Sequence, residues 1–264
     1  MEKRLIARGV LAGVVGALVV FVFGRVCVEP VIARAIAYED GRTEAEHAMG
    51  VHEHGEELFS RAVQANAGLG FGVLLFGASM GALLAVLFCL VYRRTGASAS
   101  QSPGALTARL AGGAFLAAYL VPFLKYPPNP PAVGQEDSIG FRTGWYLASV
   151  LISIVALLAA IWLSKRLSVR FGNPQGKLLA AGSYLVAVGA VMVLLPNVDE
   201  VPGPLLDDHG VILYPGFPAE TLYEFRLSGL ASQILLWATI ALVFGALAGR
   251  LLDEPAERSS RSLA

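Results

Sequence analysis

Three of the four histidines in the chain lie in one short segment that is rich in glutamate. The segment contains His47, His52, His54 and Glu56. Imidazole and carboxylate ligands together suit divalent first-row metal ions such as Co²⁺, Ni²⁺ or Zn²⁺. The histidines at positions 52 and 54 could chelate one ion, with His47 or Glu56 completing the set. The sequence therefore predicts a metal site here, with His209 after two aspartates as a weaker candidate and a solvated acidic loop as the alternative.

A second group of polar residues surrounds a proline-rich segment at 127–131. Proline fixes φ and lacks an amide donor, so this segment should be extended and the preceding helix should end before it. Pro122 removes one more backbone hydrogen bond inside an apolar run, a loss that packing or a nearby polar group must compensate. We expect the group to line a path for a substrate, or the outer mouth of such a path. The alternative is a stiff loop that only sets the spacing of the helices. Its members are Lys125, Tyr126, Asn129, Arg142, Asn197, Asp199, Glu200 and Arg226.

Three arginines stand at the expected outer ends of helices. They are Arg61, Arg142 and Arg226. A cation at a helix N-terminus opposes the macrodipole, so we expect each arginine to have an acidic partner or a cluster of carbonyl groups. Glu29, Asp199 and Glu200 are candidate partners, and Lys125 could pair with Asp199 or Glu200. Snorkelling of the arginines at the membrane surface is the alternative.

Motifs for catalysis are missing from the sequence. The pattern Gly-x-Ser-x-Gly at 77–81 lies in an apolar run, where it has neither the strand-to-helix turn nor the histidine that a nucleophile needs. There is no Walker A motif, His-Glu-x-x-His motif or dinucleotide fingerprint. The apolar runs contain no ionisable residue at their centres, which argues against a proton relay at the midplane. We therefore expect no enzyme and no resident cofactor.

The composition predicts an integral membrane protein. The chain is 55% hydrophobic and 15% charged, and its mean hydropathy is +0.62. Its formal net charge of +0 gives no sign of a nucleic-acid partner. The lipid bilayer is the expected environment for six apolar runs long enough to cross its ~30 Å core. These runs cover 5–27, 67–92, 106–124, 145–163, 178–195 and 229–249.

The charges predict the orientation of these helices. Most of the 20 lysines and arginines fall in the termini and the two short loops, so both termini should be cytoplasmic and the three long loops outside. The predicted fold is all-α, with three helix-loop-helix hairpins at 1–92, 106–163 and 178–250. They form a single membrane domain, 1–264, with a short polar tail at 251–264. The first apolar run exceeds the ~7 to 15 residues of a secretory signal, so we expect an uncleaved anchor.

Two sequence patterns recur along the chain. Each odd-numbered helix should end near a proline, at Pro30, Pro127 and Pro196, which suggests an internal repeat of the kind that places sites at repeat interfaces in transporters. Glycines four residues apart should permit close approach of helix backbones. These pairs are Gly9/Gly13, Gly68/Gly72, Gly77/Gly81 and Gly245/Gly249.

Several segments together resemble the CbtA family, whose members are predicted to be cobalt-transporter subunits. The resemblance covers nearly the whole length of the chain. It rests on Glu29-Pro30 with Ala35-Ile36-Ala37-Tyr38-Glu39, and on the segments 119–134, 139–143 and 194–202. The family implies a polytopic protein of the bacterial cytoplasmic (inner) membrane that takes up cobalt for cobalamin synthesis. It also implies a small one-span, histidine-rich partner of the CbtB type.

Two functions are consistent with these observations. The first is a membrane subunit of a Co²⁺ uptake system, supported by the six spans, the outer histidines and the resemblance. The alternative is a non-transporting membrane scaffold or assembly factor, supported by the lack of buried ionisable residues and of an energy-coupling motif.

Overall fold

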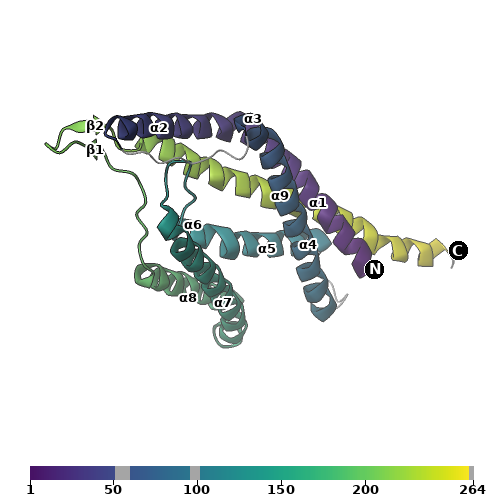
Figure 1. The fold of residues 1–264 in the computed structure, drawn as a ribbon. Coiled ribbons are helices and arrows are strands. Elements are labelled where there is room, and N and C mark those ends of the chain that lie inside the picture. Colours follow the sequence, from purple (N-terminus) through teal and green to yellow (C-terminus); the bar gives the residue numbers. More distant parts are fainter. Residues whose placement is uncertain (51–59, 96–101, 262–264) are drawn as a thin grey trace. The chain divides into compact units, whose positions relative to one another are not determined.

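The computed structural model describes residues 1–50, 60–95 and 102–261 of the chain. These residues are predominantly helical, and the strands among them form one short two-stranded hairpin (Figure 1). Six helical stretches in this part of the chain are long and apolar enough to cross a membrane, and they contain the six predicted spans to within one residue. The predicted all-α membrane fold with six transmembrane helices is therefore confirmed. In chain order the elements are α1 (Glu2–Phe23), η1 (Gly24–Val28), α2 (Glu29–Ala48), α3 (Arg61–Val63), η2 (Gln64–Gly68), α4 (Leu69–Thr95), α5 (Pro103–Phe115), η3 (Leu116–Leu120), α6 (Val121–Lys125), η4 (Glu136–Ser138), α7 (Ile139–Phe171), α8 (Asn173–Leu194), β1 (Leu205–Leu206), β2 (Ile212–Tyr214) and α9 (Ala219–Arg261).

The chain forms two compact units. The first unit is built from α1, α4, most of α5 and most of α9. The second unit contains most of α2, the segment from η3 through α8, the strand hairpin and the first turns of α9. The three-hairpin arrangement, the side on which the termini lie and the single-domain assignment stay predictions.

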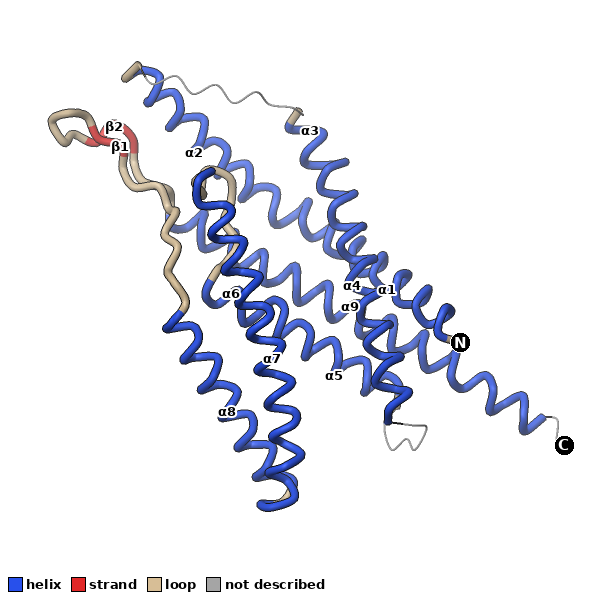
Figure 2. The backbone as a smooth tube through the Cα atoms, turned by 60° about the horizontal axis from the view of Figure 1, so that its bottom comes forward, coloured by secondary structure: helices blue, strands red, loops and turns tan. Residues whose placement is uncertain are grey.

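Close packing of α1 against α4 characterises the first unit (Figure 2). A Cβ atom added at Gly9 or Gly13 of α1 would overlap the backbone carbonyl of Gly81 or Gly77 of α4. A Cβ atom at either glycine of α4 would overlap α1 in the same way. The missing side chains let the two backbones touch, which is a main source of helix association in lipid. The sequence prediction is confirmed for these two glycine pairs.

The other two glycine pairs behave differently. In the described part of the chain, a Cβ at Gly72 or Gly249 would meet nothing within 4 Å, and one at Gly68 would make an ordinary contact. Gly245 of α9 does approach α5, because a Cβ there would lie 3.2 Å from Cα of Gly104. The predicted close packing is thus wrong for Gly68/Gly72 and holds for only one member of Gly245/Gly249. Spacing alone does not show whether a neighbouring helix covers that face.

The first helix continues past Pro30, where the sequence predicted its end. α1 passes through the π-helical turn η1 into α2, which ends only at Ala48. A π turn shifts the hydrogen-bond register by one residue, so the helix can accommodate a residue that lacks an N–H group. The predicted helix end at Pro30 is therefore wrong, and much of the expected loop is helical.

The same local structure precedes Pro122. The π-helical turn η3 ends two residues before Pro122, just as η1 ends two residues before Pro30. Tyr146 of α7 donates its hydroxyl to the carbonyl oxygen of Ala118 at 3.5 Å, which is the limit of a hydrogen bond. In a regular helix this carbonyl would accept from the N–H group that Pro122 lacks. Pro122 is itself fully buried, so both packing and this long polar contact lie where the sequence requires compensation.

The second unit is organised around α7 and α8. These helices pack along each other on either side of Gly172, whose φ of 84° reverses the chain. Tyr184 and Val188 of α8 are buried against Val121 of α6. The hydroxyl groups of Ser153 and Tyr184 lie 3.3 Å apart, so a buried polar pair joins α7 to α8.

A short strand hairpin, which the sequence did not predict, lies between α8 and α9. β1 and β2 pair in antiparallel fashion. The carboxylate of Asp207 accepts the N–H groups of His209 at 2.9 Å and of Val211 at 2.8 Å, and Gly210 has a φ of 79°. An aspartate that bonds to the following backbone and a glycine with positive φ are what a tight turn requires.

α9 begins earlier than its predicted transmembrane run. Its first residue is Ala219, directly after Pro218, and the helix extends well beyond the apolar part. Arg226 therefore lies about two turns inside the helix. Its predicted position at the helix N-terminus is wrong.

An aromatic cluster fixes the segments around the second unit's loops. Tyr38 of α2 packs against Phe217 and Tyr214, with ring centroids 4.9 Å and 5.4 Å away. Its hydroxyl donates to the carbonyl oxygen of Pro215 at 3.0 Å. Val133, which follows the proline-rich segment, is buried in the same cluster. Three segments that are distant in sequence are thus held together beside the proline-rich loop.

Candidate functional site

Glu200 is the centre of a polar network in the second unit. Its side chain is 4% exposed and lies 3.2 Å from Nη1 of Arg142. The amide of Asn129 donates to the same carboxylate at 3.1 Å, and the hydroxyl of Ser138 donates to its other oxygen. A buried carboxylate is costly unless it is paired and hydrogen-bonded. These three donors supply both conditions for Glu200.

Two arginines extend this network. Arg142, in the first turn of α7, also donates through Nη2 to the carbonyl oxygen of Pro127 at 2.7 Å. Arg226 of α9 donates to the side-chain oxygen of Asn129 at 3.1 Å. Asn129 thus accepts from one arginine and donates to Glu200. The predicted acidic partner is confirmed for Arg142, whereas the partner of Arg226 is an amide.

Two further contacts join the proline-rich connection to the segment after α8. The ammonium group of Lys125 donates to the side-chain oxygen of Asn197 at 2.6 Å. The hydroxyl of Tyr126 donates to the carbonyl oxygen of Pro196 at 2.9 Å. Tyr126 is buried, and this burial raises the pKa of its phenol. Both contacts hold the end of α6 against the end of α8.

The predicted pairing of Lys125 with Asp199 or Glu200 is wrong. Lys125 instead binds Asn197, the acceptor next to the end of α8. Glu200 is buried and takes its charge partner from α7. Asp199 is exposed, and its carboxylate accepts the N–H group of Val201 at 3.4 Å.

The first unit contains a comparable pair. Arg61, the first residue of α3, forms an ion pair with Glu29 at the start of α2. Arg25 lies 3.8 Å from the same carboxylate. The predicted acidic partner of Arg61 is therefore confirmed, and each of the three arginines makes a specific polar contact.

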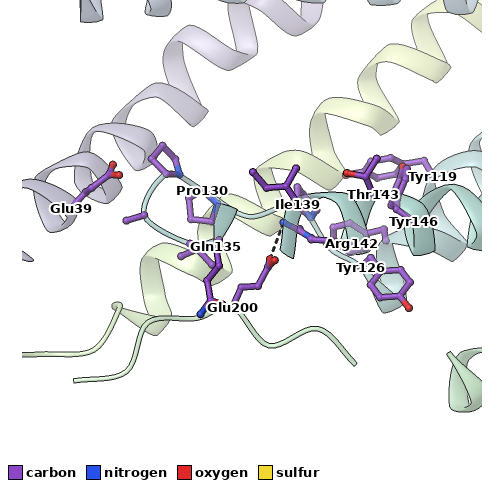
Figure 3. Close-up of a pocket in the computed structure, with 16 residues that line it drawn as sticks. Glu39, Tyr119, Tyr126, Pro130, Gln135, Ile139, Arg142, Thr143, Tyr146 and Glu200 are labelled. Carbon is purple, nitrogen blue, oxygen red and sulfur yellow. Dashed lines mark ion pairs between the residues drawn. The ribbon is translucent and has the colours of Figure 1, made fainter. Parts of the chain in front are cut away.

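A pocket of about 560 Å³ lies beside Glu200, wholly within the second unit (Figure 3). Aromatic rings and the proline-rich segment form most of its lining, and the rings of Tyr119 and Phe123 stack with centroids 5.6 Å apart. A mainly apolar cavity with a few convergent polar groups is typical of a small-molecule site. The polar and aromatic residues of the lining are Glu39, Tyr119, Phe123, Tyr126, Gln135, Arg142, Thr143, Tyr146 and Glu200.

The comparison with known families identifies the class of protein. A sequence model of the CbtA family, described as a probable cobalt transporter subunit, matches residues 2–249. The chain belongs to the CbtA family. No curated protein and no solved structure matches it. With its six apolar helices, this CbtA protein is a multi-pass membrane protein.

The histidines predicted to bind metal in the CbtA chain are only partly described. His52, His54 and Glu56 lie outside the described residues. His47 is half-buried in the last turn of α2, and His209 is exposed in the turn between β1 and β2. In the ranges 1–50, 60–95 and 102–261, no three His, Cys, Asp or Glu side chains form a group that could hold a metal ion. The metal site stays a prediction.

Several residues of the CbtA pocket were not predicted from the sequence. Tyr119 belongs to a run of aromatic residues four positions apart, which places it on one helix face with Phe123. Tyr146 follows Arg142 by one helical turn, so it shares the face of α7 that lines the pocket. Glu39 had no comparable signal, because its distance in sequence from the other lining residues is bridged only by the fold.

Proposed function

We propose that this CbtA chain is the membrane subunit of a Co²⁺ uptake system in the cytoplasmic membrane of a bacterium. It serves cobalamin synthesis and acts with a small one-span, histidine-rich subunit of the CbtB type. The family match over residues 2–249 carries the proposal. Six helices that are long and apolar enough to cross a membrane support it.

In this proposal the polar network of the second unit shapes the outer mouth of the path. All of the residues nominated for this role except Asp199 make hydrogen bonds or an ion pair with one another or with the segment after α8. Buried networks of this kind become rigid where their members are paired; in the described structure Nε of Arg226 is buried without a partner, so the pairing is tightest around Glu200. The network therefore suits the support of an entrance better than direct binding of a bare cation, because three of its charged side chains are positive.

The loop histidines take the role of first ligands for the ion. His47, His52 and His54, with Glu56, offer the imidazole and carboxylate groups that Co²⁺ prefers. His209 remains a separate and weaker candidate, because Asp207 beside it bonds to the turn backbone.

Uptake of radioactive cobalt tests the proposed function. Cells that contain the chain and its partner should accumulate more ⁵⁷Co²⁺ at limiting cobalt than cells without them, and a plasmid copy should restore the difference. Uptake of an unrelated divalent ion such as Mg²⁺ serves as the control and should not change. Equal cobalt uptake in all strains would contradict the proposal and would favour a non-transporting scaffold.

Calorimetry with the purified chain tests the metal ligands. Replacing His47, His52 and His54 together by alanine should weaken Co²⁺ binding by at least tenfold. Glu44→Gln is a matched control, because Glu44 is exposed on the same helix as His47 and is not a proposed ligand. Unchanged binding in the triple variant would place the metal site elsewhere.

A further inference from the structure

The turn between α7 and α8 carries positive charge with no acid nearby in the sequence to balance it. Residues 162–178, called the basic turn below, contain Lys165, Arg166, Arg170 and Lys177, and all four side chains are exposed. No aspartate or glutamate occurs from 139 to 194. In the described part of the chain none of the four forms an ion pair, whereas several arginines elsewhere pair with a glutamate. These charges are therefore available to an anion from outside the chain.

The backbone of the basic turn is closely packed. Gly172 reverses the chain, and its N–H group donates to the carbonyl oxygen of Ser168 at 3.1 Å. A Cβ atom added at Gly176 would lie 2.4 Å from the backbone nitrogen of Ser168, so the start of α8 meets the last turn of α7 here (Figure 2). Arg166 and Arg170 lie one helical turn apart on the same face of α7. A helix and a tight turn, not a long loop, therefore position the cations.

Exposed apolar side chains lie among these cations. Trp162 is 58% exposed and Val169 is 91% exposed. The guanidinium of Arg166 lies 5.0 Å from the ring centroid of Trp162. The guanidinium of Arg170 lies 5.4 Å from the ring centroid of Phe171. Tryptophan beside cations is typical of the membrane–water interface, and a water-soluble anion alone would leave this apolar surface in water.

We propose that the basic turn binds a phospholipid with an anionic headgroup. Arg166 and Arg170 hold the lipid phosphate through guanidinium N–H groups, which match phosphate oxygens in pairs. Lys165 and Lys177 add positive potential, which favours a headgroup with net negative charge over a zwitterionic one. The ring of Trp162 packs against the glycerol and the upper acyl carbons. This lipid site lies at the opposite end of α7 from the polar network and does not depend on cobalt uptake.

General attraction to the membrane surface is the alternative. Lysine and arginine side chains near helix ends reach the lipid phosphates of any bilayer without selecting a headgroup. A lipid site differs in two measurable ways. It prefers an anionic lipid to a zwitterionic one, and the preference depends on the arginines of the basic turn but not on exposed cations elsewhere.

Quenching of Trp162 by brominated lipid tests the proposal in the full chain. The reporter protein carries Trp145→Phe and Trp237→Phe, which leaves Trp162 as the one tryptophan of the chain. It is placed in phosphatidylcholine nanodiscs that contain brominated phosphatidylglycerol or, at the same mole fraction, brominated phosphatidylcholine. We expect quenching by the anionic lipid to be stronger by about threefold or more, because each cation near the surface attracts it. Equal quenching by the two lipids would overturn the proposal and would favour an acidic protein segment as the occupant.

A variant without the two arginines locates the lipid at the basic turn. Arg166→Gln combined with Arg170→Gln should make quenching by the two lipids equal. Arg4→Gln combined with Arg94→Gln is the matched control, because both are exposed arginines of the first unit, and it should keep the preference. An unchanged preference in the first variant, or an equal loss in both, would contradict the proposed site.

Inorganic phosphate separates a lipid from a soluble ligand. Added at matched ionic strength, it should leave the lipid preference intact, and loss of the preference would overturn the lipid in favour of a free phosphate. If the reporter protein does not fold, the unaltered chain and its variant with Arg166→Gln and Arg170→Gln are compared with all three tryptophans present. A stronger response of the unaltered chain to the anionic lipid then supports the proposal, and equal responses sink it.

Discussion

The two units of this CbtA protein depend on opposite kinds of contact. In the first unit, α1 meets α4 through glycines, and a single added Cβ atom would overlap the facing backbone. In the second unit, a buried carboxylate is held by an arginine, an amide and a hydroxyl group. Lipid gives no hydrophobic force between helices, so the first unit relies on close backbone packing. The second relies on the pairing of polar groups around a buried carboxylate.

This difference separates structural from functional surfaces. An interface of glycines leaves no room for a ligand and offers it no polar side chains. A network of charged side chains beside a pocket of about 560 Å³ offers both. The first unit should therefore be sensitive to added volume, and the second should be sensitive to lost charge or lost hydrogen bonds.

Removal of the central carboxylate should have the largest effect. Glu200→Ala leaves Arg142 without its ion partner and the amide of Asn129 without its acceptor, whereas the hydroxyl of Ser138 keeps the carbonyl oxygen of Gln135 at 2.9 Å. Breaking a buried pair costs about 3 kcal/mol or more, so we expect a loss of about 3 kcal/mol in the free energy of unfolding. Denaturant titration followed by the fluorescence of Trp145 and Trp162 in α7 measures this loss.

The neighbouring acid supplies the control for this prediction. Asp199 is exposed and bonds only to nearby backbone in the described structure. Asp199→Ala should therefore change the free energy of unfolding by less than about 0.5 kcal/mol. Similar losses in the two variants would show that the network around Glu200 does not stabilise the second unit.

One added methyl group should have the next largest effect. In Gly77→Ala the new Cβ would lie 2.6 Å from the carbonyl oxygen of Gly13 and 2.8 Å from Cβ of Ala17. Overpacking of this kind costs about 1 to 3 kcal/mol. Cys89 is buried in α4, so its reaction with a thiol dye during heating reports the opening of the first unit. Cys27 is exposed and is first replaced by serine.

Gly72→Ala is the matched control on the same helix. A Cβ at Gly72 meets no other described atom within 4 Å. Alanine is the better helix former by about 0.5 to 1 kcal/mol, so this variant should not open earlier than the parent. Equal dye reaction in both glycine variants would mean that contact with α1 does not decide stability.

The sequence predicted the membrane fold because its signals are local. Runs of apolar residues fix the six helices, and the prolines after Lys125 and Leu194 end α6 and α8 as expected. The continuation past Pro30 was missed, because η1 absorbs the missing hydrogen bond by a change of register that no residue type announces. The start of α9 was missed because its first turns are polar and do not belong to the apolar run.

The sequence predicted which residues belong to the candidate site but not which of them bind one another. Charge and position near prolines were enough to nominate Arg142, Asn129 and Glu200. Which acceptor each cation binds depends on how deeply the acceptor is buried and on how far the cationic side chain extends. Lys125 therefore binds Asn197, and Arg142 binds Glu200. Glu39 joins the pocket only through the fold. Pairing across distant segments is a property of the tertiary structure.

A conservative change at Arg142 should have a smaller effect than loss of Glu200. Arg142→Lys keeps the charge but cannot reach Glu200 and the carbonyl oxygen of Pro127 together, so a loss of about 1 to 2 kcal/mol is expected. Arg34→Lys is the control, because Arg34 pairs with Glu224 at the surface of the same unit and exposed pairs contribute about 0 to 1 kcal/mol. Denaturant titration measures the free energy of unfolding of both variants. Equal losses would contradict a special role for the planar guanidinium group of Arg142.

The smallest effect should come from the hydroxyl of Tyr126. Tyr126→Phe removes its hydrogen bond to Pro196 and should cost about 1 kcal/mol at neutral pH. Burial raises the pKa of this phenol, so the folded protein favours its protonated form. The resulting stability is present below the ordinary tyrosine pKa of about 10 and is lost as the pH rises from there through the raised pKa. The free energy of unfolding of the parent should therefore fall toward that of Tyr126→Phe above about pH 10, since the other tyrosines titrate in both proteins. A constant difference between the two at all pH values would show that Tyr126 ionises as easily in the folded protein as in the unfolded chain.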